Sequence, residues 1–202
     1  MGRIMIINGS PRAPKSNSKQ YAELFSKVCP NETKYFNITK TNHLDICRAM
    51  HGFSDILFVF PLYADGIPVT LLNFLKTLEG NSPQKKPTVS ILINCGFLEP
   101  GQNDVAVKII KLFCRQNDYS FGSVLKIASG EAILSTLFRL LVCSKVKKLA
   151  SSIVKQNYQN LKVTMPIPQK LFIKASTTYW TNYGKRNGIT KEHMATMQIE
   201  KQ

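Results

Sequence analysis

Residues 4–12 are an apolar run that passes directly into a polar loop: Ile4-Met5-Ile6-Ile7-Asn8-Gly9-Ser10-Pro11-Arg12. A second stretch repeats this design at residues 56–68: Ile56-Leu57-Phe58-Val59-Phe60-Pro61-Leu62-Tyr63-Ala64-Asp65-Gly66-Ile67-Pro68. Short, continuous apolar runs are typical of strands that are buried on both faces of a parallel sheet. Ligands of open parallel sheets bind outside the carboxyl ends of the strands, where the strand order reverses. The two loops are therefore the first candidates for a binding site.

Strand and helix patterns alternate outward from these stretches, which predicts an α/β fold. Strands are predicted at residues 3–7, 33–38, 55–60, 88–94 and 123–128, and helices at 16–28, 44–50, 69–78, 104–117 and 131–157. Since crossovers between parallel strands are right-handed, we expect a doubly wound, five-stranded parallel sheet with helices on both faces. The order 2-1-3-4-5 brings the loops after strands one and three to the same crevice.

The chain beyond the fifth strand predicts a helical extension. After Pro166 and Pro168, a helix is expected over residues 172–186, with Gly188 as its C-cap and Thr190 at the start of a last short helix. We expect residues 1–202 to form a single domain, with residues 165–202 as its C-terminal extension. This extension either covers the ligand crevice or supplies a dimer contact.

Composition narrows the class of protein. The 202 residues are 44% hydrophobic, enough for a substantial core, and no apolar run approaches the ~18 residues of a membrane-spanning helix. Five widely spaced cysteines without a C-x-x-C pair favour neither a disulfide framework nor a metal site. The protein is therefore expected to be cytoplasmic, with no bound metal and no membrane insertion.

The formal charge of +15 is compatible with nucleic acid, anionic lipid or anionic substrates as ligands. The lysines are scattered, however, and no basic stripe is interleaved with aromatic residues. We interpret the charge as a generally basic surface and expect no nucleic-acid partner.

The loop after the first strand has the residues of a phosphate site. Hydroxyl groups and free backbone N–H groups at a helix N-terminus favour an anion. The candidate ligands are Ser10, Arg12, Ser16, Asn17 and Ser18. The loop contains neither G-x-G-x-x-G nor the GK[ST] ending of a P-loop, and an N-cap followed by a polar turn is the alternative interpretation.

The loops after strands three and four offer flat and apolar surface for a heterocycle. The first consists of Pro61, Leu62, Tyr63, Ala64, Asp65 and Gly66, and the second of Asn94, Cys95, Gly96 and Phe97. A phosphate site beside such surface suits flavin mononucleotide (FMN). Ordinary βα turns are the alternative. No histidine lies near Cys95 in the sequence, so a buried structural thiol is favoured over a nucleophile, and no catalytic side chain is assigned.

Several motifs together resemble the NAD(P)H-dependent FMN reductase family of the flavodoxin-like superfamily. They are N-G-S-P-R with its trailing S-N-S, P-L-Y-A-D-G-I-P, N-C-G-F, S-G-E at residues 129–131 and K-R-N-G-I-T at residues 185–190. The resemblance implies a flavodoxin-like fold in which the phosphate loop holds the FMN phosphate and the isoalloxazine ring lies against residues 61–66 and 94–97. It further implies NADPH or NADH as co-substrate, a small electron acceptor (a quinone, a nitro or azo compound, or free flavin) and a homodimer.

Two other functions remain open from the sequence. One is an electron carrier or redox sensor that docks a protein partner, although flavodoxin carriers are typically acidic. The other is a basic binding module that has lost flavin and uses residues 137–155 on membranes or nucleic acid. The compact cysteine cluster of the related iron–sulfur flavoproteins is missing from the sequence.

Overall fold

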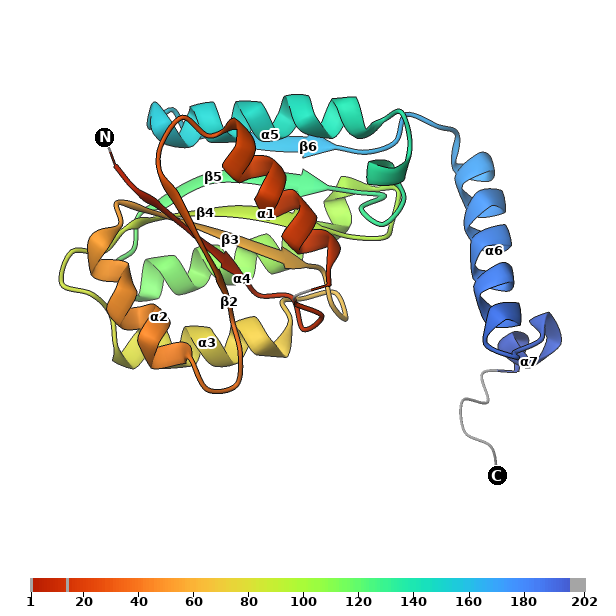
Figure 1. The fold of residues 1–202 in the computed structure, drawn as a ribbon, viewed down its shortest axis with the longest axis horizontal. Coiled ribbons are helices and arrows are strands. Elements are labelled where there is room, and N and C mark those ends of the chain that lie inside the picture. The colour runs from red at the N-terminus through yellow and green to blue at the C-terminus, as the bar shows by residue number, and fades with distance from the viewer. Residues whose placement is uncertain (1, 14, 197–202) are drawn as a thin grey trace. The chain divides into compact units, whose positions relative to one another are not determined.

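The computed structural model describes residues 2–13 and 15–196 (Figure 1). The chain divides into two compact units, Met1–Met165 and Pro166–Gln202, and each is described by itself. The strands of the first unit are β1 (Ile4–Asn8), β2 (Thr33–Asn37), β3 (Asp55–Pro61), β4 (Thr88–Asn94), β5 (Phe121–Ile127) and β6 (Asn160–Val163). Its helices are α1 (Asn17–Val28), α2 (His43–Ala49), α3 (Val69–Gly80), α4 (Asp104–Gln116) and α5 (Arg139–Val154). Short 3-10 helices lie at Met50–Gly52, Pro100–Asn103 and Ile133–Ser135.

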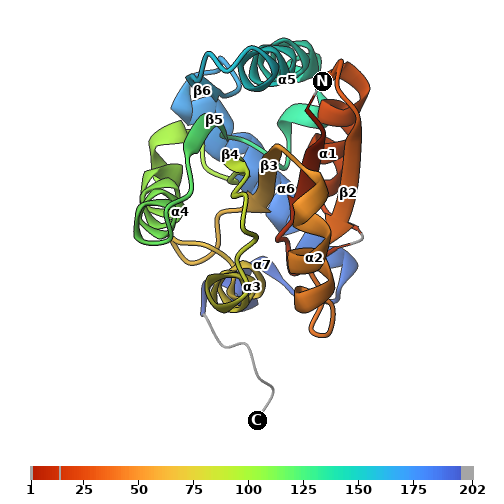
Figure 2. The same ribbon diagram turned by 90° about the vertical axis from the view of Figure 1, so that its left-hand side faces the viewer.

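The six strands form one parallel sheet in the order β2-β1-β3-β4-β5-β6. Helices α1 and α5 lie on one face, and α2, α3 and α4 lie on the other (Figures 1 and 2). The chain leaves β1 toward β2 and returns to β3 on the opposite side of β1, so the strand order reverses between β1 and β3. The α/β fold class, the doubly wound sheet and the order of the first five strands are confirmed.

The prediction of five strands was wrong, because β6 adds a sixth strand beside β5 at one edge of the sheet. Its four residues, Asn160 to Val163, alternate between exposed and more buried positions. So short an alternation gives little signal in the sequence. The strand is stabilised by its pairing with β5 and not by local propensity. The predicted helix over residues 131–157 is also shorter, since Thr136 has an extended backbone and α5 begins only at Arg139.

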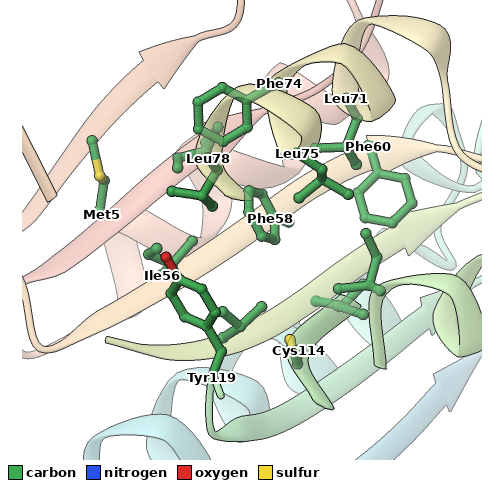
Figure 3. Close-up of a cluster of buried hydrophobic side chains, with 14 of the residues drawn as sticks. Met5, Ile56, Phe58, Phe60, Leu71, Phe74, Leu75, Leu78, Cys114 and Tyr119 are labelled. Carbon is green, nitrogen blue, oxygen red and sulfur yellow. The ribbon is translucent and has the colours of Figure 1, made fainter. Parts of the chain in front are cut away.

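The main hydrophobic cluster lies between the sheet and helices α2, α3 and α4 (Figure 3). Alternate residues of β3, namely Ile56, Phe58 and Phe60, belong to it. From α3, Phe74 meets Phe58 edge to face, with ring centroids 6.3 Å apart. This packing holds β3, and therefore the loop that follows it, against α3.

Replacing Phe74 by alanine is expected to lower the free energy of unfolding by about 4 kcal/mol, because it leaves a cavity in a fully buried cluster. Leu72→Ala, on the exposed side of the same helix, is the matched control and is expected to cost well under 1 kcal/mol. Denaturant titration measures both values. Similar losses for the two variants would contradict the assignment of the core.

The second unit is a helical hairpin made of α6 (Gln169–Arg186) and α7 (Lys191–Ala195). Gly188 ends α6 at φ +73°, while Ile189 N–H donates to Gly184 O and Gly188 N–H donates to Lys185 O. This is a Schellman arrangement, which favours glycine at the left-handed position. Thr190 caps α7 by accepting from His193 N–H at 3.1 Å. No described helix of either unit combines the length and apolar character that a bilayer-spanning segment needs.

Candidate cofactor site

The loop after β1 is folded back on itself by its own side chains. Ser10 N–H donates to Asn8 Oδ1 at 2.9 Å, and Arg12 N–H donates to Ser10 Oγ at 3.3 Å. Ser10 is buried, whereas the Arg12 side chain is exposed. The loop therefore has a hydrogen-bonded base at Ser10 and an exposed guanidinium at Arg12.

The same loop leads into the N-terminus of α1. Ser16 is the N-cap, and its Oγ accepts from Lys19 N–H at 3.1 Å. The backbone N–H groups of Asn17 and Ser18 lie in the first turn, where an α-helix supplies no internal acceptors. This end of α1 faces the carboxyl edge of the sheet, so the helix dipole and the free donors favour an anion beside Arg12.

Ser18 and Asn94 are both buried and are bonded to each other. Asn94 Nδ2 donates to Ser18 Oγ at 3.1 Å and to Phe60 O at 3.2 Å, and Leu62 N–H donates to Asn94 O at 2.7 Å. Asn94 thus joins α1, the end of β3 and the loop that follows it. The side chains of Ser18 and Asn94, both predicted to bind the cofactor, are therefore hydrogen-bonded to other parts of the site. The backbone N–H of Ser18 lies in the first turn of α1.

The loop after β3 is a tight hairpin that raises an aromatic ring into solvent. Tyr63 and Gly66 exchange two backbone hydrogen bonds of 3.1 and 2.9 Å, and Ala64 and Asp65 both have positive φ, at 44° and 57°. Two consecutive positive φ values are typical of a type I′ turn, which favours glycine, asparagine and aspartate and is strained for Ala64. Tyr63 is 55% exposed at the base of this turn. The hydrogen-bonded turn thus holds the aromatic ring of Tyr63 where a ligand can contact it.

The loop after β4 is bonded to the residues that follow β5. Gly130 N–H donates to Cys95 O at 2.7 Å, and Ser129 N–H donates to Phe97 O at 2.5 Å. Within this loop Gly96 and Phe97 are exposed, and Phe97 at 48% offers a second aromatic surface. A Cβ at Gly130 would lie 3.0 Å from Asn94 Cβ and 3.1 Å from Cys95 O, so the close approach requires glycine.

Cys95 is a buried thiol, and desolvation by that burial raises its pKa. Its Sγ accepts a hydrogen bond from Asn103 Nδ2 at 3.3 Å. The thiol is held neutral, whereas a nucleophilic cysteine needs a lowered pKa and access to solvent. Cys95 therefore shapes the loop and is not equipped for covalent chemistry. Among the described residues, no group of three histidine, cysteine or acidic side chains is arranged to hold a metal ion.

Because the folded state keeps Cys95 protonated, the free energy of unfolding is expected to decrease at alkaline pH. The contribution of the protonated Cys95 thiol to stability is fully present below the pKa of an unfolded thiol, about 8.5. It is lost as the pH rises through the higher pKa of the folded state. We expect the free energy of unfolding to fall as the pH rises above about 8.5, and Cys95 in the native protein to react with iodoacetamide at least ~100-fold more slowly than in the denatured protein. Peptide mass spectrometry measures the labelling, and rapid native labelling of Cys95 would refute the buried assignment.

Several residues that support the site were not selected from the sequence. Asn8 Nδ2 donates to Tyr35 Oη at 2.8 Å, and Tyr35 Oη donates to Asn37 Oδ1 at 2.5 Å. Asn8 and Asn37 are directly paired at the ends of β1 and β2. A polar residue that closes an apolar strand is the sequence signal that could have indicated this network.

Two further contacts tie the loops to the helices around them. Thr70 Oγ1, at the start of α3, donates to Gly9 O at 2.9 Å. Tyr21 Oη, on α1, donates to Gly130 O at 2.7 Å. These bonds join segments 61 and 109 residues apart, and such pairings cannot be deduced from local patterns.

The three predicted loops lie at one edge of the sheet, since β1, β3 and β4 are consecutive neighbours and all end there. Their strand ends are in register, with Asn8 opposite Val59 and Pro61 opposite Asn94. The loops flank the point between β1 and β3 at which the strand order reverses, where open α/β sheets bind their ligands.

Neither protein-family models nor curated proteins match this sequence. Known structures do match its fold. The NAD(P)H:quinone oxidoreductase from Methanothermobacter marburgensis superposes with a TM-score of 0.57 at 11% identity, covering 75% of this chain and 95% of its own. A flavodoxin of Streptococcus pneumoniae TIGR4 superposes with a TM-score of 0.56 at 12% identity, covering 76% and 99%. The fold is flavodoxin-like.

An azoreductase from Bacillus anthracis str. Sterne has the same architecture, with a TM-score of 0.52 at 14% identity and coverage of 77% of this chain and 100% of its own. The flavodoxin-like fold of the present chain carries β6 as an additional strand beside β5. At identities of 11–14% these likenesses establish the architecture alone.

Proposed function

We propose that this protein is an FMN-dependent NAD(P)H oxidoreductase that passes electrons to a small acceptor. The observation that carries the proposal is the set of three loops at the reversal of strand order, one with anion-binding donors and two with exposed aromatic rings. Flavodoxin-like sheets bind FMN at this switch point. The structurally similar proteins are a quinone oxidoreductase, an azoreductase and a flavodoxin, which supports a flavin as the cofactor.

The residues around α1 fit a phosphate group. The proposed ligands are the backbone N–H groups of Asn17 and Ser18, the hydroxyl groups of Ser10 and Ser16, and the Arg12 guanidinium. Neutral donors at a helix N-terminus and one exposed cation provide hydrogen bonds and charge together. The chain's net charge of +15 adds a long-range attraction for anionic ligands, including a nicotinamide dinucleotide.

Residues 61–66 and 94–97 fit the isoalloxazine ring. Tyr63 and Phe97 supply the aromatic surface, while Gly66 and Gly96 permit close approach of backbone donors. The type I′ turn and the bonds from residues 129 and 130 hold these groups in place before any ligand binds. Preorganisation of this kind lowers the cost of binding.

When bound, flavin supplies the hydride and electron transfer chemistry itself. The protein's part is to bind the cofactor, orient it and leave one side open for a small partner. No side chain is proposed as an acid, base or nucleophile, in keeping with the neutral, buried thiol of Cys95. The acceptor is proposed to be a quinone, a nitro or azo compound, or free flavin.

The test begins with the purified full chain. We expect a yellow protein that releases FMN on denaturation and that NADPH or NADH bleaches under anaerobic conditions. Colour without bleaching by either nucleotide would favour the electron carrier or redox sensor. A colourless protein that FMN cannot reconstitute would overturn the proposal and favour the binding module.

The proposal also includes a cytoplasmic homodimer in which residues 165–202 extend one flavodoxin-like domain. Light scattering on the FMN-loaded protein tests the oligomeric state. A monomer at micromolar concentrations would refute the proposed dimer. It would not affect the cofactor assignment, which the release and bleaching of FMN test separately.

A further inference from the structure

We propose that α6 docks on an anionic lipid surface as an interfacial helix. The proposal is independent of the flavin assignment, since α6 belongs to the second unit and the candidate cofactor site to the first. Across the described part of the second unit, residues 166–196, the only buried residue is Gly184. The hairpin therefore has no apolar core of its own.

One side of α6 carries an aromatic face, defined here as Phe172, Tyr179, Trp180 and Tyr183. The spacing of 7, 8 and 11 residues from Phe172 places these side chains on one side of an α-helix. Tyr179, Trp180 and Tyr183 are 57%, 44% and 52% exposed. Their ring centroids lie 5.1–6.4 Å apart, so the three rings touch one another and form a continuous surface.

The opposite side of α6 is basic. Lys170, Lys174 and Lys185 share it, and no acidic residue occurs between positions 169 and 186. An aromatic side opposed to a cationic side is typical of helices that lie in the plane of a membrane interface. Tyrosine and tryptophan are the residues enriched there, because each has an apolar body and one polar atom that stays hydrated.

Charge favours lipid over a second copy of this chain. Residues 1–165 contain 21 Lys and Arg against 10 Asp and Glu, and residues 166–202 contain six against two. A cationic helix that docked on either unit of another copy would approach a surface of its own sign. An anionic bilayer offers the complementary charge, and each basic side chain near such a surface strengthens binding by about fivefold.

The contacts between rings also favour lipid over single-stranded nucleic acid. Single strands bind in a basic groove that tracks the backbone, with successive bases each stacked on an open aromatic face. Here Tyr179 is stacked on Tyr183, and Trp180 meets both of them edge to face. Rings packed in this way present a compact apolar surface to a hydrocarbon boundary and offer few open faces to bases.

Trp180 is the only tryptophan of the chain, so it reports on this surface directly. The full-length protein is mixed with vesicles of phosphatidylcholine alone, or with vesicles that contain about one third phosphatidylglycerol. We expect co-sedimentation and a blue shift of Trp180 emission with the anionic vesicles only, and both signals should weaken as salt is raised. FMN affinity is measured in parallel and should not change.

Two pairs of variants make the test specific. Lys170→Gln with Lys174→Gln should weaken vesicle binding about 20-fold, whereas Lys76→Gln with Lys108→Gln, on exposed sites of α3 and α4, should weaken it less than threefold. Tyr179→Ser with Tyr183→Ser should abolish the blue shift while circular dichroism stays that of the native protein. Far-ultraviolet circular dichroism of every variant confirms that the fold is retained.

Three results would overturn the proposal. The first is the absence of anionic vesicle binding. The second is a blue shift that grows with protein concentration without lipid, which would assign the aromatic face to a second copy. The third is vesicle binding that survives the double tyrosine variant, which would place the contact elsewhere on the basic surface.

Discussion

Arg12→Glu is expected to raise the dissociation constant of FMN about 100-fold, which corresponds to about 3 kcal/mol of binding free energy. The substitution removes a charge-assisted hydrogen bond to the phosphate and places a carboxylate beside a dianion. Only the backbone N–H of Arg12 holds the loop, through Ser10 Oγ, and the side chain itself is exposed. We therefore expect the variant to fold normally. Titration of the apoprotein with FMN, followed by fluorescence quenching, measures the change.

Arg115→Glu is the matched control for this prediction. It makes the same change of charge on an exposed residue in the last turn of α4, which ends at the amino edge of the sheet. It should alter FMN affinity less than about threefold at physiological salt, since screening weakens exposed charges more than ~8 Å apart. Equal effects of the two variants would mean that net charge, and not a phosphate site at α1, attracts the flavin.

The architecture of the first unit was largely predictable because its central strands are unambiguous. The apolar run at residues 55–61 sits in the middle of the sheet, and helices α1 and α4 each show a clear apolar side. β6 was not predictable for the opposite reason. Four residues at a sheet edge, Asn160 to Val163, carry hardly any pattern, and their pairing with β5 depends on tertiary contacts.

The loops of the candidate site could be chosen from the sequence, whereas the bonds that connect them could not. Ligands of open parallel sheets bind at the carboxyl ends of strands, and this alone indicates residues 10, 63 and 94 from the sequence. This rule does not show that Ser18 accepts from Asn94, or that Tyr21 reaches Gly130. Such contacts require the crossing of α1 over the sheet. The same limit explains why Thr70 and Tyr35 were missed.

Asn94→Leu is expected to damage both halves of the site at once. The substitution preserves size but removes the Nδ2 donor, so Ser18 Oγ and Phe60 O lose a buried partner. Buried groups left unpaired cost about 1–3 kcal/mol each, so we expect a loss of about 3 kcal/mol and a midpoint of thermal unfolding about 10 °C lower. In addition, FMN affinity should fall at least ~30-fold at a temperature where the variant is folded, because the N-terminus of α1 and the loop after β3 lose their common anchor.

The control for Asn94→Leu is a buried hydrogen bond far from the proposed site. Ser152, on α5, shares a 2.7 Å hydrogen bond with Ser123 on β5, and both residues are buried. Ser152→Ala should lower stability by about 1–2 kcal/mol and leave FMN affinity unchanged. If the two variants lost FMN affinity in proportion to their stability, Asn94 would support only the fold. A loss of affinity confined to Asn94→Leu would mean that this amide sets the spacing between the phosphate loop and the aromatic loops, a role that follows from its place at the end of β4 beside the reversal of strand order.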